Sequence, residues 1–307
     1  MSPKVTVLTG GVGGAKLVEG LGAILAPADL TAVVNTGDDF RHFGLAISPD
    51  IDTLLYTLSG KANRTLGWGR EGETWSFMAA LRSLGGEDWF NLGDGDLALH
   101  VLRSARLAGG EPLSRIVGDF ARQWGLGLTI LPMSEDPVET RVDTDQGLLA
   151  FQRYFVEHQC RPAVRAVDFV GAETARPAPG VIEAIACADV VLIAPSNPWL
   201  SIDPILAVAA IRQALIDTRA PVVVVSPLVA GKAVKGPTAK LMAELGLAVN
   251  NHTIAAHYQG WMAGMVVHGE DAAPGDVPVA RTDTLMHDRG DRERVARVAL
   301  ALALDLR

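Results

Sequence analysis

The stretch VTVLTGGVGGAKL, residues Val5–Leu17, carries the clearest fold signal in the chain. A β-branched apolar run is followed by four glycines and then by an amphipathic run. This order predicts a buried strand at Val5–Leu8, a tight turn and a helix over Ala15–Leu25. Such a turn is typical of phosphate-binding loops, because glycine lets the backbone approach a diphosphate and the helix start offers N–H groups. The predicted phosphate-binding glycines are Gly10, Gly11 and Gly13.

The spacing of this loop matches neither standard nucleotide-binding motif. A dinucleotide fingerprint that starts at Gly11 would need glycine at Lys16. A P-loop that starts at Gly10 would need glycine at Ala15 and a hydroxyl residue at Leu17. The loop therefore argues against a dinucleotide-dependent dehydrogenase and a P-loop NTPase. Lys16, one turn into the helix, adds a positive charge for a phosphate, although a tight turn with a solvated lysine stays open as the simpler interpretation.

Composition narrows the function classes. The chain has 307 residues, 49% of them hydrophobic and 20% charged, as in ordinary globular proteins. A net charge of −8 argues against a nucleic-acid partner. The two cysteines, Cys160 and Cys187, form no disulfide framework and no metal spacing. With no membrane-length apolar run and no signal-peptide pattern, we predict a soluble cytoplasmic protein with no membrane partner.

Further short apolar runs predict a sheet. They are LTAVVN (Leu30–Asn35), ADVVLIAP (Ala188–Pro195), APVVVVSP (Ala220–Pro227) and MVVH (Met265–His268). Because they are apolar on both faces and alternate with helical patterns, they predict a doubly wound, mostly parallel sheet of Rossmann-like α/β class. Two clear helical patterns are Asp203–Thr218 and Asp291–Leu306, each with an aspartate near its N-cap.

The pattern changes in the middle of the chain. Between about residues 60 and 135 helical stretches replace the strand signals, and Asp145-Gln146-Gly147 then predicts a β-hairpin turn. We predict a single α/β domain over residues 1–307, with a helical and partly β insertion at about 60–160. The insertion is expected to form one wall of a cleft, because ligands bind beyond the carboxyl ends of parallel strands.

Acidic residues gather after the second predicted strand, in NTGDDFRHFGLAISPDIDT (Asn35–Thr53). They are Asp38, Asp39, Asp50 and Asp52. Oxygen ligands without nearby histidine or cysteine favour Mg²⁺, which takes one or two carboxylates plus phosphate oxygens. Helix capping by Asp50 or Asp52, and a turn at Asp38-Asp39, explain these residues equally well.

Two further segments carry polar or aromatic side chains. In APSNPW two prolines restrain Ser196 and Asn197 at the end of a predicted strand, which favours either ligand binding or a rigid connection. Trp68, Trp75 and Trp89 gather near glycines and predict either core packing or a wall for a flat aromatic ligand.

Taken together, six segments resemble the 2-phospho-L-lactate transferase family of coenzyme F-420 biosynthesis. They are LTGGVGGAKL, VNTGDDFRHFGLAISPDIDTLLYTLSG, GWGREGETW, LGDGDLALH, LPMSEDPVET and APSNPWLSIDPIL, in this order. The resemblance implies a Mg²⁺-dependent transfer from a guanosine-diphosphate-linked phospho-acid to the terminal hydroxyl of the 5-deazaflavin Fo, with release of GMP. The transferred acid, whether derived from 2-phospholactate, phosphoenolpyruvate or 3-phosphoglycerate, stays open.

The resemblance also implies roles for residues that match the family's motifs. The residues it places at the nucleotide diphosphate are Gly10, Gly11, Lys16, Ser196, Asn197 and Pro198, to which we add Gly13 and Asn35. Asp50 is the implied metal ligand, with Asp38 as a second, and Asp50 or Asp52 is the predicted catalytic proton acceptor. The chain departs from the family at Gly95, where relatives carry arginine.

An alternative stays open beside the transferase. A non-enzymatic relative of the same superfamily would bind a uridine-diphosphate sugar and act as a metabolic regulator. For the transferase, we also expect a homodimer, the usual state of such enzymes.

Overall fold

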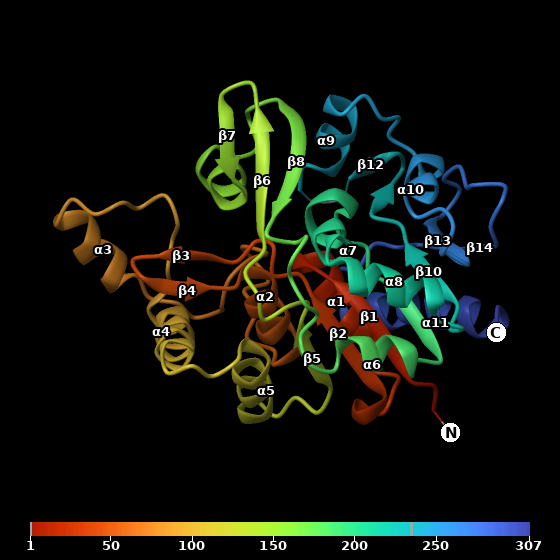
Figure 1. Ribbon diagram of the computed structural model, residues 1–307, viewed down its shortest axis with the longest axis horizontal. Helices are drawn as coiled ribbons and strands as arrows, with labels where there is room; N and C mark the ends of the chain where they lie inside the picture. The colour runs from red at the N-terminus through yellow and green to blue at the C-terminus, as the bar shows by residue number, and fades with distance from the viewer. Residues whose placement is uncertain (1, 234–235) are drawn as a thin grey trace.

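The centre of the computed structural model, which describes residues 2–233 and 236–307, is a seven-stranded parallel sheet (Figure 1). Its strand order is β14-β13-β10-β9-β1-β2-β5, and all six neighbouring pairs run parallel. The strands of this sheet are β1 (Val5–Thr9), β2 (Leu30–Val34), β5 (Thr129–Pro132), β9 (Val190–Ile193), β10 (Val222–Val225), β13 (Gly264–His268) and β14 (Val279–Thr282). This is the α/β, doubly wound sheet that the sequence predicts.

Helices cover both faces of the sheet, because successive strand residues point to opposite sides. Val5 and Val7 belong to the apolar core on one side, and Leu8 belongs to the core on the other. Helices that pack on the Val7 side are α1 (Gly11–Gly22), α2 (Pro49–Leu58), α5 (Leu113–Gln123) and α11 (Arg289–Asp305). Those on the Leu8 side are α6 (Val181–Ala186), α7 (Asp203–Ala207), α8 (Ala209–Asp217), α9 (Thr238–Glu244) and α10 (Asn251–His257).

The two edge strands, β5 and β14, were not predicted as members of the sheet. No residue of β14 is fully buried, and β5 alternates between exposed and buried positions. Edge strands pair on one side only and tolerate polar residues, so neither carries a continuous apolar run. The range of about 60–160 expected for the insertion thus contains a strand of the main sheet, and β8 (Val164–Val170) extends beyond it.

The rest of the middle segment projects from the main sheet (Figure 1). It contains the helices α3 (Ser76–Ser83) and α4 (Asp94–Ala108) and a three-stranded sheet of β7 (Gly147–Ala150), β6 (Glu139–Thr144) and β8. In the figure α3 lies far to the left of the main sheet, and β6, β7 and β8 stand above it. The predicted hairpin is confirmed, since Thr144 pairs with Gly147 across the turn.

Two predicted helices differ from the observed ones. Helix α1 begins at Gly11, not Ala15, so three of the four glycines lie in its first turn. The helix predicted over Asp203–Thr218 is broken at Val208, whose backbone is extended (ψ 98°) and whose side chain is buried. A π-helical turn, η3 (Pro198–Ile202), precedes α7.

The remaining short elements are η1 (Pro27–Asp29), β3 (Phe40–His42), β4 (Leu45–Ile47), η2 (Arg153–Glu157), β11 (Leu228–Val229) and β12 (Lys232–Ala233). Within the described part of the chain, length and hydropathy qualify no single helix to span a membrane. One bent pair, Pro198–Ala207 with Ala209–Asp217, passes both criteria with a bend of 91°.

Candidate active site

The glycine turn lies at the carboxyl end of β1 and is fastened to the turn after β9. Gly10 is the N-cap of α1 and has an extended backbone. The Ser196 hydroxyl donates to the Gly10 carbonyl (2.6 Å) and accepts from the Gly10 N–H (3.2 Å). Ser196 therefore connects the ends of the neighbouring strands β1 and β9 and lies beside the glycine turn.

The glycines of this turn are needed because other groups approach them closely. A Cβ atom on Gly10 would lie 2.6 Å from Asp50 Oδ2, and one on Gly13 would lie 2.7 Å from the Pro195 carbonyl oxygen. On Gly14 a Cβ would overlap Thr9 Oγ1. Gly11 has a φ of +53°, which favours glycine. The turn thus brings the backbone of Gly10 directly against Asp50.

Three predicted site residues meet next to this turn. The Asn35 amide, just after β2, donates through Nδ2 to Asp38 Oδ1 (2.9 Å) and to Asp50 Oδ2 (3.0 Å). The Asn35 Oδ1 atom accepts from the Gly37 N–H (2.7 Å), which fixes the amide orientation. Asp38 and Asp50 are buried, so two carboxylates share one donor in a site closed to bulk water.

Burial sets the protonation of these acids. It raises the pKa of Asp38 well above its ordinary value, and the nearby charge of Asp50 raises it further, while the Asn35 hydrogen bond opposes both. Burial also raises the pKa of Asp50 to about 6, against the hydrogen bonds from Asn35 and from the Gly11 N–H. Burial also raises the pKa of Asp39 well above its ordinary value, although the Ser48 hydroxyl donates a hydrogen bond to the Asp39 carboxylate (2.7 Å). A cation beside Asp38 and Asp50 would relieve this repulsion.

Asp50 and Asp52 do not cap α2. The N-cap is Ser48 and Pro49 occupies the first turn, so both acids lie inside the helix. Asp52 has different partners from the Asp38–Asp50 pair. The buried Arg103 of α4 donates hydrogen bonds to both oxygens of the Asp52 carboxylate. These bonds give Asp52 a structural role and leave its predicted catalytic role without geometric support.

The remaining predicted residues have defined contacts. Asn197 caps η3 by accepting from the N–H groups of Trp199 (3.0 Å) and Leu200 (3.2 Å), and Pro198 begins that turn. The Nδ2 of Asn197 is buried and has no hydrogen-bond partner in the described part of the chain. This amide leaves a donor for a ligand, as a binding role requires.

Lys16 contacts the segment that precedes α11. Its ammonium donates to the Met286 carbonyl oxygen (2.7 Å), in the segment that precedes α11. Lys16 also lines a cavity of about 120 Å³ formed by α1, α2, residues 60–69 and the start of α11. A smaller cavity beside it shares Trp68 and Gly69 and also touches Trp75.

Gly95, where the chain departs from the family, has a geometric reason to be glycine. A Cβ atom at this position would overlap the guanidinium of Arg70. Arg70 lines the smaller cavity and lies 3.4 Å from Glu73, which accepts from the Gly95 N–H (2.6 Å). An arginine from another segment therefore occupies the space above Gly95.

Sequence reasoning missed Arg103, His287 and Arg292. Arg103 lies four residues after Leu99, on the apolar face of α4. A charged residue on the apolar face of a predicted helix is the sequence signal that could have revealed it. No sequence signal links His287 and Arg292 to Lys16, because these residues are brought together by helix packing.

Metal binding by this site would need ligands from a substrate. Among residues 2–233 and 236–307, no group of three or more His, Cys, Asp or Glu is placed to hold a metal ion. Two carboxylates with phosphate oxygens from a substrate are a usual set for Mg²⁺. The donor set of Asp38 and Asp50 therefore fits this ion.

Comparisons with known proteins give concordant results. A family model described as 2-phospho-L-lactate transferase CofD matches residues 5–301. The chain is 42% identical over 317 residues to the phosphoenolpyruvate transferase of Kitasatospora aureofaciens, with 99% of each chain covered. It is 40% identical to proteins of the same name from Streptomyces coelicolor, covering 99% of each chain, and from Mycobacterium sp. strain KMS, covering 98% of each.

A solved structure also resembles this fold. A UPF0052 family protein from Bacillus halodurans has a TM-score of 0.63 and 18% identity, and the match covers 98% of this chain and 99% of that chain. At this identity the likeness concerns the fold.

Proposed function

This chain belongs to the 2-phospho-L-lactate transferase CofD family, and from that premise we propose the reaction that it performs. It is a transferase of F-420 biosynthesis. We propose that it moves a phosphoenolpyruvyl group from a guanosine-diphosphate-linked donor to the terminal hydroxyl of the 5-deazaflavin Fo and releases GMP. The names of the relatives at 40–42% identity favour phosphoenolpyruvyl over the phospholactyl and phosphoglyceryl alternatives.

The observation that carries this proposal is the buried carboxylate pair beside the glycine turn. Asn35 holds Asp38 and Asp50 together, and Asp50 lies against Gly10 and Gly11 at the start of α1. Phosphoryl-type transfer depends on positioning and on neutralising charge more than on a protein nucleophile. A site with rigid carboxylates next to a backbone that admits close approach suits this chemistry.

Mg²⁺ is the proposed cofactor, held by Asp50 and Asp38. Bound there, it would neutralise charge on the diphosphate and on the departing phosphate of GMP. Asn35 keeps both carboxylates facing the same point, and burial of all three residues limits access of bulk water. Of the two predicted proton acceptors we retain Asp50, because Arg103 engages both oxygens of Asp52.

The proposed nucleotide-binding residues lie at the carboxyl ends of β1 and β9. Ser196 fixes the backbone of Gly10, and the unpartnered Nδ2 of Asn197 is available to a phosphate or base. Trp68 is 50% exposed and Trp75 is 37% exposed, so we propose these two exposed indole rings as the wall for the deazaflavin ring. Trp89 is excluded from this wall, since it packs against His42 and Arg153.

The test is product formation followed by mass spectrometry. Fo is incubated with Mg²⁺ and each guanylylated acid, and we expect the mass of the phosphoenolpyruvyl product and of GMP. Asp50→Asn should lower kcat at least 100-fold with an unchanged circular dichroism spectrum, because a carboxylate ligand is lost. The exposed Asp305→Asn variant serves as the matched control and should keep full activity.

Two results would overturn the proposal. One is binding of a uridine-diphosphate sugar without any transfer to Fo, which is the behaviour of the regulator alternative. The other is near-normal turnover of Asp50→Asn. The homodimer and the cytoplasmic location remain proposals, which gel filtration at several concentrations and cell fractionation would test.

A further inference from the structure

The cavity beside Lys16 is lined by basic side chains in an acidic protein. Lys16, Arg64, His287 and Arg292 all border it, from three separate segments of the chain. No aspartate or glutamate borders it among the described residues, although the chain carries a net charge of −8. A cavity with this lining favours an anion.

The cavity is continuous with the face of α2 that carries Asp50. Thr53 and Thr57 border the cavity, and they follow Asp50 by three and seven residues, so all three lie on one face of the helix. At a rise of about 1.5 Å per residue, the cavity extends from about 4.5 Å to about 10.5 Å along α2 from Asp50. This face of α2 therefore leads from Asp50 to the cavity.

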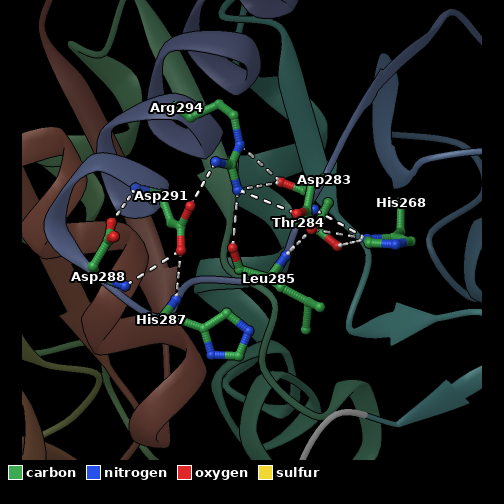
Figure 2. Close-up of polar contacts among 8 residues, drawn as sticks. All are labelled: His268, Asp283, Thr284, Leu285, His287, Asp288, Asp291 and Arg294. Carbon is green, nitrogen blue, oxygen red and sulfur yellow. Dashed lines mark hydrogen bonds and ion pairs between the residues drawn. The ribbon is translucent and has the colours of Figure 1, made fainter.

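His287, which borders the cavity, belongs to the segment Asp283–Asp288, and α11 holds this segment in place (Figure 2). Arg294 donates to the carbonyl oxygens of Asp283 (3.1 Å) and Leu285 (3.1 Å), as Figure 2 shows. Its Nη1 also donates to Asp291 Oδ1 (2.6 Å).

Asp291 completes this arrangement. Its Oδ2 accepts from the N–H groups of His287 (3.0 Å) and Asp288 (3.3 Å). The same segment supplies the Met286 carbonyl oxygen to Lys16. The backbone that presents His287 to the cavity is therefore fixed before any ligand binds.

Arg292 retains an unused donor. Its side chain is 9% exposed, and Nη1 pairs with Glu19, but Nε is buried without a hydrogen-bond partner in the described residues. Arg64 borders the cavity from another segment, which the β-bridge between Ala62 and Arg70 holds in place. Cationic donors thus face the cavity from the α11 side and from the 60–69 side.

We propose that this cavity binds the carboxylate of the acid that is transferred, with Arg64, His287 and Arg292 as its specificity-determining residues. The inference rests on the proposed function, and it adds the residues that contact the free carboxylate of the donor. A volume of about 120 Å³ suits a small acid and not a nucleoside, since sites for larger organic ligands run to about 300–1,000 Å³.

The experiment measures binding by calorimetry for the full chain with Mg²⁺. The ligands are guanylylated phosphoenolpyruvate, GDP and free phosphoenolpyruvate, and the KM for Fo is measured in parallel. The variants are Arg64→Gln and His287→Gln, both exposed positions, and the control is Arg115→Gln, an exposed arginine of α5. Circular dichroism verifies that each variant folds.

In Arg64→Gln we expect at least tenfold weaker binding of guanylylated phosphoenolpyruvate and of phosphoenolpyruvate, because a charge-assisted hydrogen bond is lost. Binding of GDP and the KM for Fo should stay within twofold, and the control should match the wild type. An equal loss for GDP would mean that the cavity takes nucleotide phosphates, and a selective rise in the KM for Fo would mean that it takes the acceptor. Either result overturns the proposal.

Failure of the proposed function gives a different result. If the wild type forms no product yet binds phosphoenolpyruvate more tightly than Arg64→Gln does, the carboxylate site stands and the reaction is wrong. If the wild type binds neither phosphoenolpyruvate nor its guanylylated form, the carboxylate site is overturned as well.

Discussion

Asn35 is the single side chain that organises the candidate site. A dinucleotide-dependent dehydrogenase would place an acid at this strand end, where it would hold a ribose. Here an amide joins two acids, since Nδ2 reaches both Asp38 and Asp50. An acid at position 35 would add a third negative charge to the pair, so the amide is the residue type that keeps the carboxylates together.

The pKa of Asp50 leads to a pH-dependent stability. Because burial raises this pKa from 3.8 to about 6, the folded protein binds more protons than the unfolded chain between these values. The contribution of Asp50 is therefore fully present below about pH 4 and is lost as the pH rises through about 6, a loss of about 2–3 kcal/mol. The difference in unfolding free energy between the wild type and Asp50→Asn, from urea melts at pH 4–7, measures it.

Magnesium provides the complementary measurement. If it binds the ionised pair together with phosphate oxygens of added GDP, magnesium with GDP should raise the stability of the wild type at pH 7 and have little effect on Asp50→Asn. A pH-independent difference between the two proteins, or an equal response to magnesium, would contradict this assignment.

In helix α1, glycines allow neighbouring segments to pack closely against the helix. Gly13 and Gly14 approach the Pro195 carbonyl and Thr9, while Gly20 lies against the backbone of Arg292 in α11. Close approach of α1 to β1 and to α11 therefore requires glycine on two of its faces. Ordinary helix propensity would disfavour all of these positions.

Gly14→Ala and Gly22→Ala form a matched pair in this helix. A Cβ at Gly14 would overlap Thr9 Oγ1, so the substitution should destabilise the fold by about 1–3 kcal/mol. At Gly22 the nearest atom is 4.0 Å away, so alanine should be neutral or stabilise by up to about 1 kcal/mol. Thermal unfolding compares them, and equal effects would show that propensity, not packing, governs this helix.

Over the whole molecule, a buried ion pair joins the projecting helices to the main core. Arg103 of α4 is fully buried and binds Asp52 of α2 and the Ala46 carbonyl oxygen. Helix α2 in turn packs on α1, so α4 is fixed relative to the glycine turn through this arginine. This arginine therefore adds a buried electrostatic contact to the packing of Leu99 and to the hydrogen bond between Tyr56 and Asp96, which also hold α4 in place.

Arg103→Met should cost about 3–5 kcal/mol, because it leaves the buried Asp52 carboxylate with only the His100 ring, 3.6 Å away, as a basic neighbour among the described residues. The double variant Arg103→Met with Asp52→Asn should recover part of that loss, since no unpaired charge remains. Urea unfolding of the single and double variants tests this. A double variant that is less stable than Arg103→Met would show that Asp52 has an important second partner.

Local patterns were sufficient for much of this protein. The alternation of β-branched runs and amphipathic helices predicted the parallel sheet, and Asp145-Gln146-Gly147 predicted the hairpin turn. Asn35, Asp38 and Ser196 were chosen as candidates because each lies near the end of a predicted strand, and carboxyl ends of parallel strands meet at one edge. Asp50 was chosen from the family resemblance. Periodicity and strand ends are local properties, and a sequence displays them directly.

Partners distant in sequence could not be read in this way. Nothing local indicates that Arg103 neutralises Asp52, 51 positions away, or that Lys16 meets the Met286 carbonyl, 270 positions away. The edge strands β5 and β14 were also not predicted from the sequence. Each has a neighbouring strand on one side only, so it tolerates polar residues and lacks a continuous apolar run. Such contacts depend on how helices and strands pack in three dimensions, so the separation of Asp52 from the carboxylate pair and the basic cavity beside Lys16 became visible only in the folded chain.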